Sequence, residues 1–168
     1  MTMKTFFIII LFQLWTTTVF CCSCEGESTV KESIDGSNIV VSAVVISQTI
    51  TDDLKQFAII QGDTTDFMYK LLKYPSRVVK LKTITLYKGQ VSSDTITIIT
   101  PPHGASCGVY FEIGKQYIIY GTTQDEINHS QKFVRKSTNN NIYWTNSCTR
   151  TTPSYKDEEA EILKLTKK

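Results

Sequence analysis

The alternation of hydrophobic and polar positions predicts a chain built mainly from short β-strands. It is clearest over Arg77–Tyr87, where side chains of opposite character follow one another. One face of this strand would carry Val79, Leu81, Thr83, Thr85 and Tyr87, and the other Lys80, Lys82, Ile84 and Leu86. Further runs rich in β-branched or aromatic residues predict strands over Ile39–Ser47, Asp94–Thr100, Val109–Ile113, Gln116–Gly121 and Lys132–Lys136. The run Ile142–Trp144 leads to Cys148, which lies in a strand-like context.

Two segments between the strands carry turn signals of different kinds. Gly114-Lys115 is predicted to join Val109–Ile113 and Gln116–Gly121 as a hairpin. The pattern is looser over Gln48–Ser76, which we interpret as a long hairpin or a protruding loop with a helical turn near Phe67–Leu72.

Helical patterns occur at both ends of this strand-rich region. Glu27–Asp35 is predicted to be a short helix with Ser28 or Thr29 as its N-cap. Asp157–Lys168 is predicted to be a closing amphipathic helix, over about 156–166, and its acidic start is interpreted as solvated. Its apolar face would carry Ala160, Ile162, Leu163 and Leu165. Five or more short strands with helices at the ends favour a mainly β fold, a small β-barrel.

The first 21 residues have the pattern of a secretory signal peptide. Lys4 precedes an apolar run of about ten residues, Phe6–Trp15, which is too short to span a bilayer. Cleavage after Cys21 leaves small residues at the positions that the signal peptidase recognises, whereas cleavage after Phe20 does not. We therefore expect a signal peptide over 1–21, a mature chain that begins at Cys22, and one secreted, extracellular domain over 22–168.

Composition and charge narrow the function classes further. The 168-residue chain has a formal charge of +2 and 20% charged residues, so it lacks the basic surplus typical of proteins that bind nucleic acid or membrane surfaces. It shows no nucleophile–base pair, metal-ligand cluster or phosphate-binding glycine loop. We expect a monomer that is not an enzyme and that needs no cofactor. Asn128-His129-Ser130 is a possible glycosylation site at Asn128.

Four cysteines remain after signal cleavage: Cys22, Cys24, Cys107 and Cys148. An even number in an exported chain predicts a disulfide framework. Zinc binding is disfavoured because the chain has no Cys-x-x-Cys pair and only two histidines. The single residue between Cys22 and Cys24 argues against a bridge between them, which leaves two long-range pairings open.

Several of these segments, taken in order, resemble the inhibitory N-terminal domain of the tissue inhibitors of metalloproteinases. The segments that carry the resemblance are Cys22-Ser23-Cys24, Ile39–Val45, Val79–Gly89 with its Tyr-Lys-Gly ending, Ser106–Val109 and Gly114–Gly121. The likeness covers about residues 22 to 150. It implies the family's netrin-like module, a five-stranded OB-fold barrel with short flanking helices and an N-terminus pinned by disulfides.

The resemblance also implies the bridges and the site. The bridges would be Cys22–Cys107 and Cys24–Cys148. The α-amino nitrogen and carbonyl oxygen of Cys22 would chelate the catalytic zinc of a metalloproteinase, the protein partner. Contacts to the target's pocket would come from Ser23, Cys24, Ala105 and Ser106. The protein itself would hold no metal.

The sequence departs from the family in three respects. A third bridge of this domain is missing, since Ile34 lies near the position of its first cysteine and the partner cysteine is absent too. The second, smaller domain of the animal inhibitors has no counterpart. Cys148-Thr149-Arg150-Thr151 with the acidic helix is more similar to short netrin-like proteins of bacteria and some invertebrates. Two alternatives stay open: a netrin-like binding module without inhibitory action, and a lipoprotein anchored to a membrane through Cys22.

Overall fold

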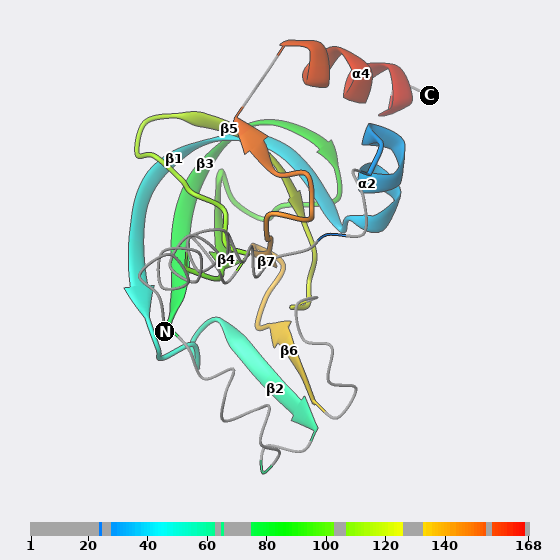
Figure 1. The fold of residues 1–168 in the computed structure, drawn as a ribbon. Helices are drawn as coiled ribbons and strands as arrows, with labels where there is room; N and C mark the ends of the chain where they lie inside the picture. The colour runs from blue at the N-terminus through cyan, green and yellow to red at the C-terminus, as the bar shows by residue number, and fades with distance from the viewer. Residues whose placement is uncertain are drawn as a thin grey trace, which may run out of the picture.

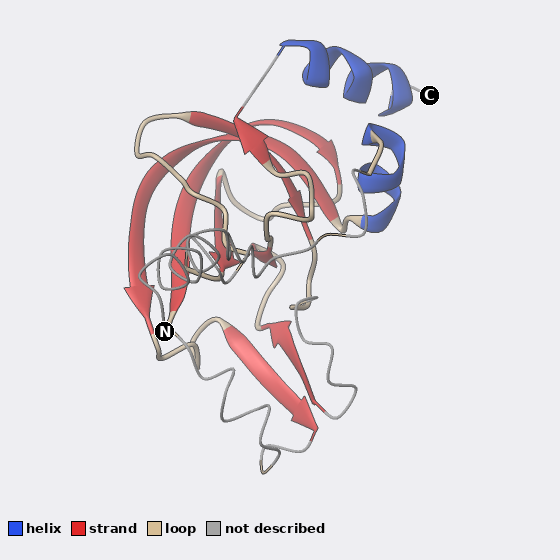
Figure 2. Ribbon diagram, viewed as in Figure 1, coloured by secondary structure: helices blue, strands red, loops and turns tan. Residues whose placement is uncertain are grey.

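The computed structural model forms a curled sheet of six strands, with two short helices packed on one side (Figures 1 and 2). It describes Cys24, residues 28–62, Thr65, and residues 75–102, 107–125, 133–153 and 156–166, without the side chain of Phe133. The strand order is β7-β4-β3-β1-β5-β8. These strands are β1 (Ile39–Thr51), β3 (Ser76–Lys88), β4 (Thr95–Thr100), β5 (Gln116–Gly121), β7 (Ile142–Trp144) and β8 (Thr152–Pro153). The predicted mainly β class is confirmed, in the form of a half-barrel sheet.

The long strand β1 is the centre of this sheet, because it pairs with β3 along one edge and with β5 along the other. Its register against β3 shifts at three places, and such irregularities bend a strand and increase its twist. One shift pairs Ser42 with Thr85 but Ala43 with Thr83. The alternation predicted for β3 changes side there. Tyr87 consequently packs against a second apolar core on the outer face of the sheet, whereas Leu81 belongs to the main core. The prediction that the two share a face is therefore wrong.

The two sides of the curled sheet approach each other beyond β5. Strand β7 runs parallel to β4, and its last residue, Trp144, forms a bridge with Thr122. The Thr122 N–H donates to the Trp144 carbonyl over 3.0 Å, and the Trp144 N–H donates back over 2.8 Å. These bonds connect the end of β5 to the edge strand β7.

The main core lies inside the curl and is formed mostly by aliphatic side chains. It consists of Ile39, Val41, Ala43, Val45, Val79, Leu81, Ile96, Ile98, Val109, Phe111, Tyr117, Ile119 and Tyr143. The hairpin predicted over Val109–Gly121 is wrong, because 109–113 is not a strand. Its buried Phe111 packs edge-on against Tyr117, and β5 pairs with β1 instead. Burial of alternate apolar side chains in an irregular segment produces the same sequence pattern as a strand.

Helices α2 (Val30–Gly36) and α4 (Lys156–Thr166) cover the outer face of the sheet, where a second core lies. It consists of Val30, Ile34, Val40, Ile118, Tyr120 and Ile162, with Tyr87 packed against them. Thr29 is the N-cap of α2 and forms a capping box with Glu32, as expected for one of the two proposed caps. In α4 only Ile162 is buried, so the predicted four-residue apolar face is wrong: Ala160, Leu163 and Leu165 are exposed.

A separate two-stranded sheet lies at the end of the molecule away from α4 (Figure 1). It pairs β2 (Ala58–Gly62) with β6 (Phe133–Ser137). Ala58 packs with Ile99, Ile142 and Trp144 in a third apolar cluster. The stretch over Gln48–Ser76, predicted to be a long hairpin or a protruding loop, therefore contains the end of β1 and the whole of β2. The helical turn expected near Phe67–Leu72 lies outside the described residues. No helix in the described part of the chain has the length and hydrophobicity needed to cross a bilayer.

Candidate functional site

The predicted site centres on the N-terminal segment and the loop before Cys107. Of the predicted site residues, Cys24, Cys107 and Cys148 are described, and Cys24 is exposed; the others lie outside the described residues. Those residues are Cys22, Ser23, Ala105, Ser106 and the possible glycosylation site Asn128. What the structure describes is the frame onto which the N-terminal segment is fastened.

The Cys24–Cys148 disulfide forms the first part of this frame. Its Cα atoms are 5.4 Å apart, and it joins positions 124 residues apart in sequence. It is the pairing implied by the family resemblance and one of the two left open by counting cysteines. Cys107 is disulfide-bonded as well, and its predicted partner Cys22 lies outside the described residues.

Cys148 is held in place by the polar turn over residues 145–151. The Asn146 side-chain oxygen accepts from the Cys148 N–H over 2.7 Å, and the Thr145 hydroxyl donates to the Tyr120 carbonyl over 3.0 Å. The Thr151 hydroxyl accepts from the Tyr120 N–H over 3.1 Å. The side chains of this turn thus fasten the disulfide to strand β5.

The backbone around Cys107 lies directly against this turn. The Ser147 N–H donates to the Cys107 carbonyl over 2.8 Å, so the residue before Cys148 contacts the other disulfide-bonded cysteine. Cys107 has a φ of +60°, in the left-handed region that ordinary residues rarely adopt. The two disulfide-bonded positions are therefore neighbours, although they are far apart in sequence.

Gly108 permits the close approach that this arrangement requires. A Cβ at Gly108 would lie closer than 3.0 Å to the backbone carbonyl groups of Pro101 and Pro102. The Val109 N–H donates to the Thr100 hydroxyl over 3.1 Å at the same junction. Gly108 thus brings together the two ends of the loop that carries Ala105 and Ser106. The sequence analysis did not select Gly108, although its place between Cys107 and a core valine was a usable signal.

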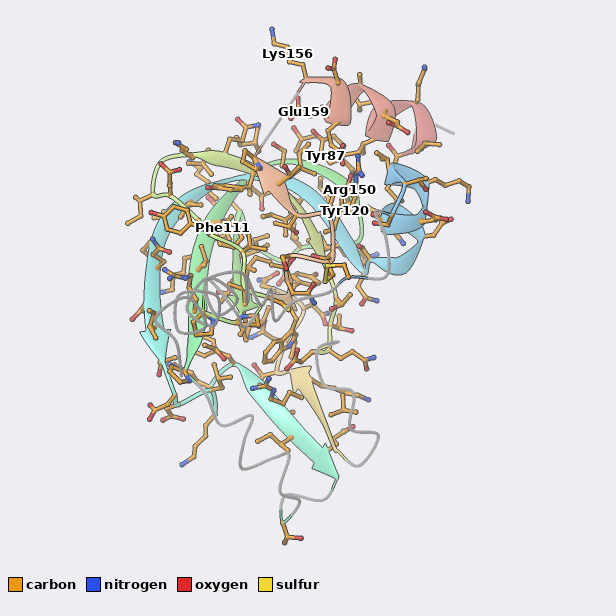
Figure 3. All side chains as sticks on the ribbon, viewed as in Figure 1. Tyr87, Phe111, Tyr120, Arg150, Lys156 and Glu159 are labelled. Carbon is orange, nitrogen blue, oxygen red and sulfur yellow. A yellow bond between two sulfur atoms is a disulfide. The ribbon has the colours of Figure 1, made fainter. Side chains whose placement is uncertain are left out.

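Arg150 and Glu158 make a second attachment for the N-terminal segment. The Arg150 guanidinium binds both carboxylate oxygens of Glu158, over 2.7 and 2.8 Å, and donates to the Ser28 carbonyl over 2.8 Å. The Tyr120 hydroxyl donates to Glu158 over 2.7 Å. Figure 3 shows Arg150 and Tyr120 close together beside α2 and below α4. The Cys-Thr-Arg-Thr motif was noted in the sequence, but the contacts of its arginine were not foreseen.

The charges in this group are mutually stabilised. Burial disfavours the charge on Glu158, but the hydrogen bonds from Arg150 and Tyr120 outweigh it and hold its pKa below the ordinary value. Burial, reinforced by the neighbouring Glu158 carboxylate, raises the pKa of Tyr120, which therefore keeps its proton. The side chain of Glu158 is only 9% exposed. The interpretation of the acidic start of α4 as solvated is therefore wrong for this residue.

A second polar contact joins α4 to the outer face of the sheet. The Tyr87 hydroxyl donates to Glu159 over 3.2 Å, and both residues are labelled in Figure 3. Glu158 and Glu159 thus both face the sheet. Because Ile162 is the only buried apolar residue of α4, these carboxylates account for much of its docking.

The described frame can hold a peptide segment rigidly, and its donor groups do not form a metal centre. Among the described residues, no three His, Cys, Asp or Glu side chains lie together in a way that could bind a metal ion. The chain matches no protein-family model and no curated protein. Functional assignment therefore depends on the motifs quoted above and on this geometry.

Proposed function

We propose that the protein is a secreted inhibitor of zinc metalloproteinases that acts through the N-terminus of its mature chain. The observation that carries the proposal is the Cys24–Cys148 disulfide, which fastens the residue two positions after Cys22 beside the Cys107 backbone. An inhibitor that presents its own N-terminus needs such a rigid attachment, because ordering a mobile segment on binding lowers affinity.

The chemistry of an N-terminal cysteine suits this role. An α-amino group has a pKa near 8, so about a tenth is neutral at pH 7, and zinc binding draws the rest into the neutral form. Catalytic zinc sites keep a position open for water or substrate, which the amine and carbonyl of Cys22 would fill together. Ser23 would enter the specificity pocket, while Ala105 and Ser106 would form the other half of the contact surface.

We also infer that the curled sheet is an OB-fold of the netrin-like type. Five of its strands follow the order β7-β4-β3-β1-β5, and the pair β4–β7 is parallel. The Thr122–Trp144 bridge between the two sides of the curl supports a partly open Greek-key barrel, as in OB-folds.

The test compares the exported protein with a variant that carries one extra alanine before Cys22. Inhibition is measured against a matrix-metalloproteinase catalytic domain and against thermolysin, after mass spectrometry of the unreduced protein has established the mature N-terminus and the disulfides. We expect the parent to inhibit and the extended variant to lose inhibition, because the amine no longer reaches the zinc. A variant with alanine added after Lys168 is the matched control and should inhibit like the parent.

Three results would refute the proposal, and two of them would point to another function. Equal inhibition by the parent and the N-terminally extended variant would exclude chelation by Cys22. Absence of inhibition by a parent that begins at unmodified Cys22 would leave a netrin-like binding module. An acyl group on Cys22 would indicate a lipoprotein. The disulfide at Cys107 supports the inhibitor over the lipoprotein, because lipidation of Cys22 would remove its predicted partner.

A further inference from the structure

The N-terminal segment is attached to the turn over residues 145–151 at two points. Cys24 is bonded covalently to Cys148, and the Ser28 carbonyl accepts from Arg150 over 2.8 Å. Three residues lie between the two points on the N-terminal segment, whereas the turn supplies both anchors within three consecutive residues, 148–150. Two anchors restrict rotation of a segment that one disulfide alone would leave able to swing.

Ser28 is itself a fixed point, because it leads directly into α2. Its hydroxyl lies 2.7 Å from the Ser33 hydroxyl, and the next residue, Thr29, caps the helix. The Arg150 bond to Ser28 therefore joins the turn to the start of α2, and α2 packs against the outer core through Val30 and Ile34. The N-terminal segment is thereby fixed to two elements of the fold.

The backbone of Arg150 adopts a conformation that needs support from its surroundings. Its φ is +62°, in the left-handed region that is unfavourable for a non-glycine residue. Such strain persists where neighbouring contacts over-determine it, and it is concentrated at functional positions. The fork of bonds to Glu158 and the bond to Ser28 are the contacts that hold Arg150 here.

Glu158 determines where the Arg150 guanidinium points. It accepts two bonds from Arg150 and one from the Tyr120 hydroxyl, and its own position is set by α4. The chain of contacts runs from α4 through Glu158 and Arg150 to Ser28. A helix near the C-terminus is thus connected to the segment that follows the proposed zinc-binding residue.

We propose that Arg150, oriented by Glu158, is a positioning residue that holds the N-terminal segment in its binding conformation, so that α4 contributes to inhibition without touching the target. This inference rests on the proposed inhibitory function. It predicts that the clamp, defined as Arg150, Glu158 and Tyr120, sets the inhibition constant through the order of the N-terminal segment.

The test uses the full-length exported protein and two independent measurements. The first is hydrogen exchange of the peptide covering 24–36, with the peptide covering β5 as internal reference. The second is the inhibition constant against the matrix-metalloproteinase catalytic domain. In Arg150→Met we expect the exchange rate of the 24–36 peptide and the inhibition constant each to rise about tenfold. This factor corresponds to the loss of one hydrogen bond from a charged group. Arg150→Lys should fall between, since one ammonium cannot reproduce the fork.

A combined variant separates positioning from general stability. Tyr120→Phe, Arg150→Met and Glu158→Leu together remove every polar member of the clamp, and apolar replacement of a buried ion pair often restores stability. We expect its unfolding midpoint to recover toward the parent value, while the inhibition constant stays raised because the bond to Ser28 is still missing. Asp35→Asn, which breaks the exposed Lys31–Asp35 ion pair, is the control and should change neither measurement.

Each outcome bears on the inference. Unchanged exchange of the 24–36 peptide in Arg150→Met would overturn it, as would recovery of inhibition in the combined variant. Faster exchange with an unchanged inhibition constant would overturn it as well. Should the parent fail to inhibit, the proposed function falls and this inference with it, and the exchange data then report only on whether Arg150 orders Ser28.

Discussion

Replacement of Gly108 by alanine should damage the frame of the site more than any other change of one methyl group. A Cβ there would lie 2.6 Å from the Pro102 carbonyl carbon and still closer to two carbonyl oxygens. Ordinary contact begins at 3.4 Å, so the two backbone segments would have to separate by roughly 0.8 Å or more. All the atoms involved are backbone, so no side chain can rotate away to relieve the clash.

The expected loss of stability follows from this displacement. Overpacking of this kind costs about 1–3 kcal/mol. The movement also strains the bond from the Val109 N–H to Thr100 and the bond from the Ser147 N–H to Cys107, each of which contributes about 1 kcal/mol. The free energy of unfolding should therefore fall by about 2–5 kcal/mol. Because Cys107 moves with Gly108, the proposed inhibition should weaken as well.

Gly36→Ala supplies the matched control for this prediction. Gly36 is the last residue of α2, and a Cβ there would meet nothing within 4 Å. The same substitution should stabilise the protein by about 0.4–1 kcal/mol, because alanine loses less backbone entropy on folding. Urea unfolding followed by fluorescence and circular dichroism measures both variants. A Gly108→Ala variant within about 0.5 kcal/mol of the parent would refute the reasoning from close approach.

Two further predictions concern helix α4. Ile162→Ala removes its single buried apolar side chain and should weaken helix docking by about 2–4 kcal/mol, seen as faster hydrogen exchange in α4. Leu165→Ala, at an exposed position, should change exchange little, and equal effects of the two would contradict the packing described. Glu158 has a pKa below its ordinary value of 4.5, so its contribution to stability is complete above that pH and is lost as the pH falls through the lowered value. The difference in free energy of unfolding between the parent and Glu158→Gln should therefore shrink as the pH is lowered from 6 to 3. A difference independent of pH would show that the charge of Glu158 does not stabilise the native state.

Local patterns predicted the elements whose stabilisation is local. The β-branched residues of β1 and the alternation at the start of β3 favour strand structure at Ile39 and Val79. This preference does not depend on which strand pairs with them. The capping box of Thr29 and Glu32 fixes the start of α2 within three residues. The Cys24–Cys148 bridge was foreseen only with the help of the family resemblance, since counting cysteines left two pairings.

The failures occurred where a distant partner decides the structure. Val109–Ile113 reads as a strand, yet Phe111 is buried without strand pairing. Leu163 and Leu165 were predicted to be buried, but α4 docks through Ile162 and through carboxylates bound to Arg150 and Tyr87. Helical periodicity identifies a face, but it does not say how much of that face meets another element.

The sequence by itself determined the mainly β class, most of the strand positions, the capped helix α2 and the cysteines available for bridges, because these depend on residue preferences over a few positions. Only the tertiary structure decided which strands pair, where β1 bends, and that Arg150 reaches Ser28 through a left-handed turn. Those features depend on contacts between residues as much as 122 positions apart. The free energy of such contacts arises only when the whole chain has folded, so no local pattern encodes them.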